Sequence, residues 1–118
     1  MIKENKTTTT QNRLNLDTKI STIVDKIVSK LSPEKIILFG SYAYGKVDED
    51  SDIDLLVVLD TTLQAAERVR MISRLLYPRI APLDIIVKTP AEIQKAYLQV
   101  DPFMHEILAK GIQVYARH

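Results

Sequence analysis

Two aspartates near the middle of the chain have the residue type and spacing of a metal site. Asp52 and Asp54 stand two residues apart at the start of an apolar run that extends to Leu59. Side chains alternate between the two faces of a β-strand, so a strand here places both carboxylates on one face. Two carboxylates this close repel each other unless a cation lies between them. Because Mg²⁺ prefers oxygen ligands, the pair predicts a magnesium site.

A phosphate site is predicted at Gly40 and Ser41, which follow the apolar residues 36–39. A short, continuous apolar run is typical of a buried strand. Glycine allows a sharp turn and a close approach of the backbone, and Ser41 supplies a hydroxyl and an N–H group at the start of a short helix. We expect this helix to continue through Tyr44 and to end at Gly45. The Gly-Ser turn and the carboxylate pair then face each other across one hairpin-like unit.

A third carboxylate, Asp84, lies inside the strand-like residues 83–87. An acidic side chain among apolar residues is costly to bury unless it is compensated. With Asp52 and Asp54, we expect Asp84 to hold one or two Mg²⁺ ions that orient the phosphates of a nucleotide during an in-line displacement. Asp84 is also a candidate general base for the attacking hydroxyl.

The order Gly40-Ser41, ten residues, Asp52-x-Asp54 resembles the signature of the DNA polymerase β-like nucleotidyltransferase superfamily. More closely, GSYAYG followed by SDIDLLV is similar to the minimal nucleotidyltransferase (MNT) proteins. These proteins are usually encoded beside a HEPN-domain protein, as the antitoxin of a toxin–antitoxin pair. The resemblance covers about residues 20–115 and includes a strand-like carboxylate in the expected place.

This resemblance implies a role for each candidate residue. Gly40 and Ser41 are expected to contact the triphosphate of ATP. Asp52 and Asp54 are expected to bind Mg²⁺, and Asp84 to complete the catalytic and metal-binding triad. The chain is then expected to transfer AMP from ATP to a tyrosine hydroxyl of a cognate HEPN toxin, which it neutralises within a heteromeric complex.

One position departs from the family pattern. The family commonly has arginine in GSxARG where this chain has Tyr44. Loss of this cation would weaken nucleotide binding, change the pose of the nucleotide or pass the task to another residue such as Lys46. Two further functions therefore stay open. One is a binding module that has lost catalysis and neutralises its partner by occlusion, and the other is a transferase for a small molecule such as an aminoglycoside.

The composition predicts one globular domain. The 118 residues suffice for one core but not for two, and 46% of them are hydrophobic. A net charge of +1 argues against a template-reading polymerase and against direct nucleic-acid binding. The absence of cysteine, of a long apolar run and of a signal-like start leads us to expect a cytoplasmic protein without a membrane segment.

The start of the chain combines a polar segment with a helical pattern. Residues 1–16 include four consecutive threonines and are expected to form a flexible arm, and residues 17–118 the nucleotidyltransferase domain. From Asp17, a predicted N-cap, apolar residues recur at helical spacing up to Leu31, and Ser32-Pro33 ends the pattern.

A second helix is predicted over residues 61–77, before Pro78. We expect its arginines to be solvated, or else to replace the cation missing at Tyr44 or to contact an acidic partner; they are Arg68, Arg70 and Arg74. Arg79 is a further candidate for the missing cation.

Two short helices and a strand are predicted at the end of the chain. Thr89 and Glu92 form a capping box, Asp101 precedes the second helix, and Gly111 ends it before a strand over residues 112–116. Phe103 is expected to lie in the core or at an interface. A hairpin-like strand pair beside helical crossovers predicts an α/β (α+β) fold with a small mixed sheet of about four strands flanked by helices. The family resemblance implies that this is the nucleotidyltransferase fold.

Overall fold

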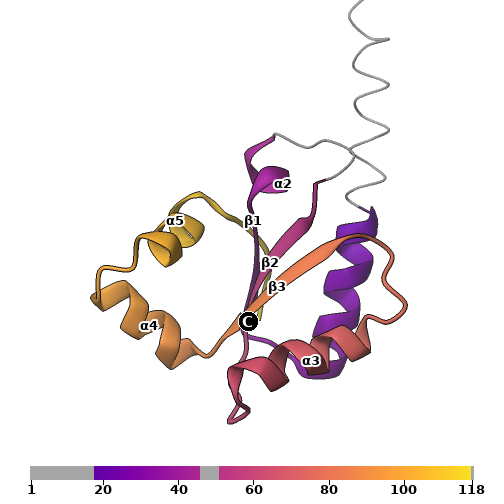
Figure 1. The fold of residues 1–118 in the computed structure, drawn as a ribbon, viewed down its shortest axis with the longest axis horizontal. Coiled ribbons are helices and arrows are strands. Elements are labelled where there is room, and N and C mark those ends of the chain that lie inside the picture. The colour runs from indigo at the N-terminus through magenta and orange to yellow at the C-terminus, as the bar shows by residue number, and fades with distance from the viewer. Residues whose placement is uncertain (1–17, 46–50, 118) are drawn as a thin grey trace, which may run out of the picture.

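A computed structural model describes residues 18–45 and 51–117 of the chain. A helix covers residues 18–31. The elements that follow are β1 (Lys35–Phe39), α2 (Ser41–Tyr44), β2 (Ile53–Val58), α3 (Ala65–Leu75), β3 (Leu83–Lys88), α4 (Pro90–Leu98), α5 (Pro102–Lys110) and β4 (Ile112–Ala116). This is the predicted order (Figure 1). The expected arm over residues 1–16, the predicted N-cap Asp17 and the loop from Lys46 to residue 50 lie outside the described residues.

The four strands form one mixed sheet in the order β3-β2-β1-β4. β1 is antiparallel to β2 and to β4, whereas β2 is parallel to β3. A parallel pair needs a long crossover, which α3 provides, while β1 and β2 form the predicted hairpin-like unit. The predicted mixed sheet of about four strands is therefore confirmed.

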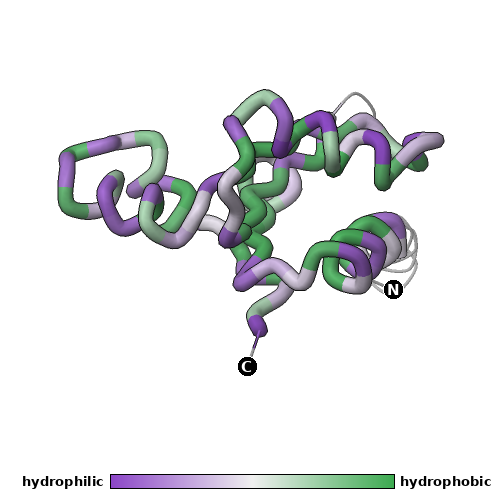
Figure 2. The backbone as a smooth tube through the Cα atoms, turned by 90° about the horizontal axis from the view of Figure 1, so that it is seen from below, coloured by the Kyte–Doolittle hydropathy of each residue, from purple (hydrophilic) through white to green (hydrophobic). Residues whose placement is uncertain are grey.

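Helices cover both faces of the sheet. The helix over residues 18–31 and α3 lie on one side of it, and α4 and α5 lie on the other (Figure 1). The molecule has two hydrophobic cores, and alternate residues of β2 belong to each. Ile53, Leu55 and Val57 lie in the first core, and Leu56 and Val58 lie in the second. Figure 2 shows the hydrophobic strands at the centre, between helices of mixed hydropathy. None of the described helices is long and apolar enough to cross a membrane.

The predicted ends of α4 and α5 are confirmed. The Thr89 hydroxyl accepts a hydrogen bond from the Glu92 N–H (3.1 Å), and a Glu92 carboxylate oxygen accepts one from the Thr89 N–H (2.8 Å). The Asp101 carboxylate accepts a hydrogen bond from the Met104 N–H (3.1 Å) at the start of α5. Gly111 is the C-cap of α5. These caps satisfy N–H groups that a helix cannot pair internally.

The helix predicted over residues 61–77 is shorter than expected, since α3 covers Ala65–Leu75. The Leu63 N–H donates to the Thr61 hydroxyl (3.2 Å), a local turn that competes with helical hydrogen bonding. Gln64 is the N-cap, and Leu76 is the C-cap two residues before Pro78. The apolar spacing alone did not reveal the turn before Gln64.

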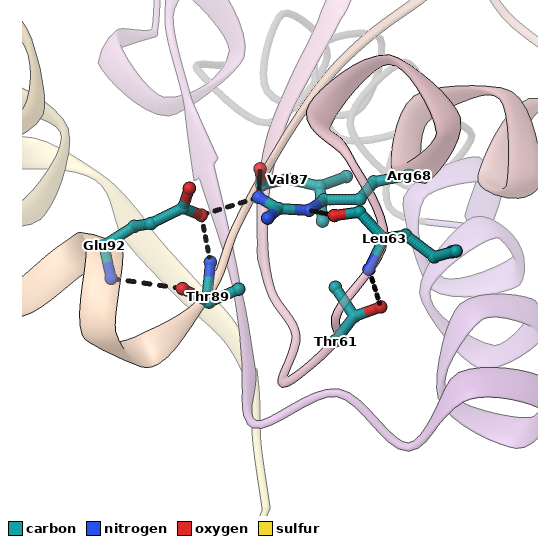
Figure 3. Close-up of polar contacts among 6 residues, drawn as sticks. All are labelled: Thr61, Leu63, Arg68, Val87, Thr89 and Glu92. Carbon is teal, nitrogen blue, oxygen red and sulfur yellow. Dashed lines mark hydrogen bonds and ion pairs between the residues drawn. The ribbon is translucent and has the colours of Figure 1, made fainter.

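The expectation that the α3 arginines are solvated is wrong for Arg68, which is 8% exposed. Its Nε donates to the Leu63 carbonyl (2.8 Å), and its Nη1 donates to the Val87 carbonyl (3.3 Å) and to the Glu92 carboxylate (2.6 Å; Figure 3). Hydrogen bonds from the Thr89 backbone N–H and from Arg68 hold the pKa of Glu92 below its ordinary value. Because this network sits at the carboxyl end of β3, Arg68 is not the replacement for the cation missing at Tyr44.

Arg68 also covers part of an open sheet edge. β3 is an edge strand, and the Leu59 N–H bonds to the Lys88 carbonyl (2.9 Å). Carbonyls alternate in direction along a strand, so the Val87 carbonyl, one residue earlier, faces away from β2. The Arg68 guanidinium donates a hydrogen bond to that carbonyl and another to Glu92, so it links α3 to α4 across β3. A carbonyl that already accepts this hydrogen bond is not available to pair with an edge strand of another chain.

This network predicts an asymmetry between two arginines of α3. Arg68→Ala should lower the free energy of unfolding by roughly 2–3 kcal/mol, because three hydrogen bonds and a buried side chain are lost. Arg70→Ala, at an exposed position of the same helix, should change it by less than about 0.5 kcal/mol. Urea unfolding of both variants measures the difference, and equal losses would contradict a stabilising role for the buried network.

Candidate active site

Two of the candidate carboxylates lie side by side on neighbouring strands. The parallel register aligns Asp54 of β2 with Asp84 of β3. Ile53 and Leu55 flank Asp54 and are fully buried in the first core, so the Asp54 side chain points to the opposite face, the one covered by α4 and α5. Each aspartate is the second residue of its strand. Both carboxylates therefore occupy the same face and the same end of the sheet.

Asp52 precedes β2 and acts on the same group electrostatically. Burial raises the pKa of the Asp54 carboxyl, and the negative charges of Asp84 and then Asp52 raise it further. Asp52 and Asp84 are exposed and Asp54 is half-buried, so the group opens to solvent. The two ion pairs between described residues are Arg68–Glu92 and Lys110–Glu106, and neither includes these aspartates. The three carboxylates thus form a site of concentrated negative charge.

The Gly-Ser turn lies directly against Asp54. Gly40 has φ 72° and ψ −153°, a backbone conformation open mainly to glycine. A Cβ atom at Gly40 would overlap the Asp54 carboxylate. The Ala43 and Tyr44 N–H groups donate to the Gly40 carbonyl (3.0 and 3.1 Å), which begins α2 at Ser41. The missing side chain at position 40 is what allows the turn and the carboxylate to meet.

The end of α2 also follows the predicted pattern. Gly45 is its C-cap in the left-handed conformation, with φ 77°. Ser41 is half-buried at the first position of α2, whereas Tyr44 is 41% exposed. The backbone at Gly40 therefore lies against Asp54, with Ser41 at the start of α2 and the aromatic side chain of Tyr44 at its end.

The chemistry of these side chains fits a hard divalent cation. All three are carboxylates, and a cation beside them would relieve the repulsion that raises the pKa of Asp54. Over residues 18–45 and 51–117, no group of three or more histidine or acidic side chains lies close enough together to hold a metal ion. Mg²⁺ commonly takes only one or two carboxylates and completes its shell with water and substrate phosphates. The assignment of Asp52, Asp54 and Asp84 as ligands stays a prediction.

A groove of about 360 Å³ lies at the other end of the sheet. Its lining includes Lys35, where β1 begins, and Val58, where β2 ends, together with Ile93, Tyr97 and Leu98 of α4. The aspartates lie at the opposite ends of these strands. The groove is therefore a feature separate from the acidic site.

Phe103, at the start of α5, was not among the candidate site residues predicted from the sequence. It was expected in the core or at an interface; it is 53% exposed and so does not lie in the core, while the neighbouring Met104 is buried. The Phe103 ring makes a perpendicular contact with Phe39, at 6.0 Å between centroids and an interplanar angle of 83°. Since Phe103 precedes the buried Ile107 by one helical turn, periodicity alone assigned it to the apolar face.

Comparison with known protein families gives a match over most of the chain. The profile of the nucleotidyltransferase domain family matches residues 19–109. A curated relative, a "putative protein adenylyltransferase" of Methanocaldococcus jannaschii, is 47% identical over 49 residues. That alignment covers 40% of this chain and 49% of the relative, so the chain spans about half the length of this protein.

Two solved structures share the fold. A "putative nucleotidyltransferase" from Sulfolobus solfataricus superimposes with a TM-score of 0.66 at 22% identity, over 91% of this chain and 86% of that one. A toxin–antitoxin structure with AMP-PNP superimposes with a TM-score of 0.56 at 21% identity, over 82% of this chain and 73% of that one. The α/β architecture with a four-stranded mixed sheet is therefore that of nucleotidyltransferase structures.

The Gly40 turn predicts a difference between two glycine variants. Gly40→Ala should be destabilised by roughly 2–3 kcal/mol and should lose nucleotide binding, because strain and overlap with Asp54 act together. Gly45→Ala is a matched control: its φ is also positive, but nothing lies within 4 Å of an added Cβ atom, so we expect about 1 kcal/mol. Urea unfolding and nucleotide titration test this, and equal stability of the two variants would contradict the close approach.

The raised pKa of Asp54 predicts a pH dependence with a defined sign. The folded state holds this proton more tightly than the unfolded state, so stability falls as the pH rises from the unfolded pKa through the folded pKa. At neutral pH and without divalent metal, Asp54→Asn should therefore raise Tm by a few degrees and remove this part of the pH dependence. Asp60→Asn, at an exposed site just beyond β2, serves as the control. A lower Tm for Asp54→Asn in EDTA at pH 7 would contradict the repulsion.

Proposed function

Because this chain belongs to the nucleotidyltransferase domain family, we propose that it is an Mg²⁺-dependent nucleotidyltransferase antitoxin. It transfers AMP from ATP to a tyrosine hydroxyl of a cognate HEPN toxin and thereby neutralises it. The observation that carries this proposal is the position of the Gly40 turn against Asp54, which is itself aligned with Asp84. A phosphate-binding turn and acidic ligands are then neighbours at one end of the sheet.

In the proposed mechanism, the Gly-Ser turn and the aspartates divide the work of holding ATP. The absence of a side chain at Gly40 lets the turn lie directly against the Asp54 carboxylate, and Ser41 offers its hydroxyl and N–H group to the phosphates. Asp52 and Asp54 would hold Mg²⁺, which would supply positive charge to neutralise and orient the triphosphate. Asp54, between the turn and Asp84, links the phosphate and metal subsites.

The transfer itself needs an attacking oxygen and a proton acceptor. The tyrosine oxygen of the partner forms a bond to the α-phosphorus, and the bond between the α-phosphorus and the bridging oxygen of the β-phosphate breaks, which releases pyrophosphate. Asp84 lies beside Asp54 and is exposed, so it can accept the phenolic proton or serve as the third metal ligand. In either role, loss of Asp84 removes transfer.

A protein acceptor is supported by the open position of the site and by the relatives. Asp52 and Asp84 are exposed, so a hydroxyl on another protein can approach them from solvent. The relative from M. jannaschii is named for protein adenylyltransferase activity, and one structural neighbour is a toxin–antitoxin with an ATP analogue. We propose that the chain acts in the cytoplasm as part of a heteromeric complex with its toxin.

A second candidate function is neutralisation by occlusion, without chemistry. It is favoured by Tyr44, which is exposed at the end of α2 where the family has a cation. Without that cation the triphosphate loses one stabilising charge, so the fold could serve as a partner-binding module alone. A small-molecule transferase of the aminoglycoside type is the third reading, and it requires no protein partner.

Transfer of label separates these functions. The full chain, ATP labelled at the α-phosphate, Mg²⁺ and the product of the neighbouring gene should give label on that partner, and EDTA should prevent it. Asp52→Asn should reduce labelling by about 100-fold or more, since it removes a metal ligand, whereas the exposed control Asp60→Asn should retain it.

The other outcomes favour the other functions. If the partner stays unlabelled, and both the wild-type chain and Asp52→Asn still bind and neutralise it, the chain acts by occlusion and not as an enzyme. Label on an aminoglycoside in the absence of any protein partner would instead favour the small-molecule transferase.

A further inference from the structure

Phe103 is an exposed aromatic residue whose position is fixed by the fold. It lies in the first turn of α5, just after Pro102, and contacts Phe39 at 6.0 Å between ring centroids. Phe39 is 8% exposed and belongs to the second core, whereas half of the Phe103 side chain remains exposed. Burial therefore does not account for the use of a large aromatic side chain at this position. The ring is held in place and still offers surface to a ligand.

Phe103 lies beside the acidic site on the same face of the sheet. The β1–β2 register places Phe39 directly opposite Asp54, and neighbouring strands are about 5 Å apart. Phe39 lies one strand spacing from Asp54. The centroid of the Phe103 ring lies 6.0 Å from that of the Phe39 ring. A nucleotide whose phosphates lie at the Gly40 turn extends its sugar and base over a comparable distance.

We propose that Phe103 is the platform on which the base of the bound nucleotide stacks. This inference rests on the proposed function and assigns the base-binding part of the same site. An aromatic ring stacks on any nucleobase through its π-face, so it supplies affinity without a pattern of hydrogen bonds.

An exposed aromatic residue of α4 is placed differently. Tyr97 of α4 is 62% exposed, but its ring is already stacked on His105, at 5.1 Å between centroids and 5° between planes. It also lines the groove at the far end of the strands, away from Asp54. Tyr97 is therefore a matched control for an exposed ring that does not reach the nucleotide.

Binding of two ligands by the full-length protein tests the platform. ATP carries a base, whereas tripolyphosphate presents the same phosphate chain without one. With Mg²⁺ present, Phe103→Leu should weaken ATP binding about tenfold in calorimetry and leave tripolyphosphate binding unchanged, because leucine keeps the apolar contact with Phe39 but has no π-face. Phe103→Tyr and the control Tyr97→Leu should bind ATP as the wild type does.

A fluorescence measurement gives a second, independent readout. The chain contains no tryptophan, so Phe103→Trp introduces a single indole at the platform. Its emission should be quenched when ATP binds and unchanged when tripolyphosphate binds, and Tyr97→Trp should respond to neither. Far-UV circular dichroism confirms that each variant is folded.

The failures of the two proposals are distinguishable. If the wild-type protein binds neither ATP nor tripolyphosphate, the proposed function is wrong, and the stacking role of Phe103 is wrong as well. If the wild type binds ATP and Phe103→Leu binds it equally well, or loses both ligands to the same extent, the stacking role is overturned while the proposed function stands. Absence of quenching in Phe103→Trp at saturating ATP would also overturn it.

Discussion

The contact between the Gly40 backbone and the Asp54 carboxylate is the constraint on which the functional end of the molecule depends. β1 pairs with β2 so that Phe39, the last residue of β1, lies opposite Asp54. The chain must then turn at the next residue without a side chain, because a Cβ atom there would occupy the place of the carboxylate. Strand pairing and the positive φ of Gly40 together bring the turn proposed to bind phosphate against a predicted metal ligand.

Charged side chains are arranged differently at the two ends of the sheet: opposite charges are paired at one end, and like charges are neighbours at the other. At the carboxyl end of β3, Arg68 is buried and fully engaged with Glu92, Leu63 and Val87, so its charge stabilises the packing of α3 and α4. At the other end, Asp54 is aligned with Asp84, and burial followed by repulsion from Asp84 and Asp52 raises its pKa. The ion pair at the first end contributes to the packing of the helices. Like charges that the fold keeps close to each other are instead typical of sites that bind a cation or transfer a proton.

Local sequence patterns were sufficient for most of the secondary structure. The capping box at Thr89, the N-cap Asp101 and the glycine after α2 each act within one helical turn, so their effects were visible in the sequence. The start of α3 was not, because the turn at Thr61 depends on a single hydroxyl that the apolar spacing conceals. Arg68 was also assigned wrongly, since its partners Val87 and Glu92 are 19 and 24 residues away in the chain.

The sequence by itself determined the kinds of element, the mixed character of the sheet and the short list of chemically capable residues. Alternation along a strand is a property of neighbouring residues, and from it the sequence predicted that Asp52 and Asp54 share a face. In the structure Asp52 precedes β2, so alternation within the strand applies to Asp54 and not to Asp52. Only the tertiary structure decided that Asp84 aligns with Asp54, that Gly40 touches the same carboxylate and that Phe103 stands two contacts away from it. Those relations depend on strand register and on how α5 packs over β1, which are set by burial of the whole core rather than by any local stretch of the chain.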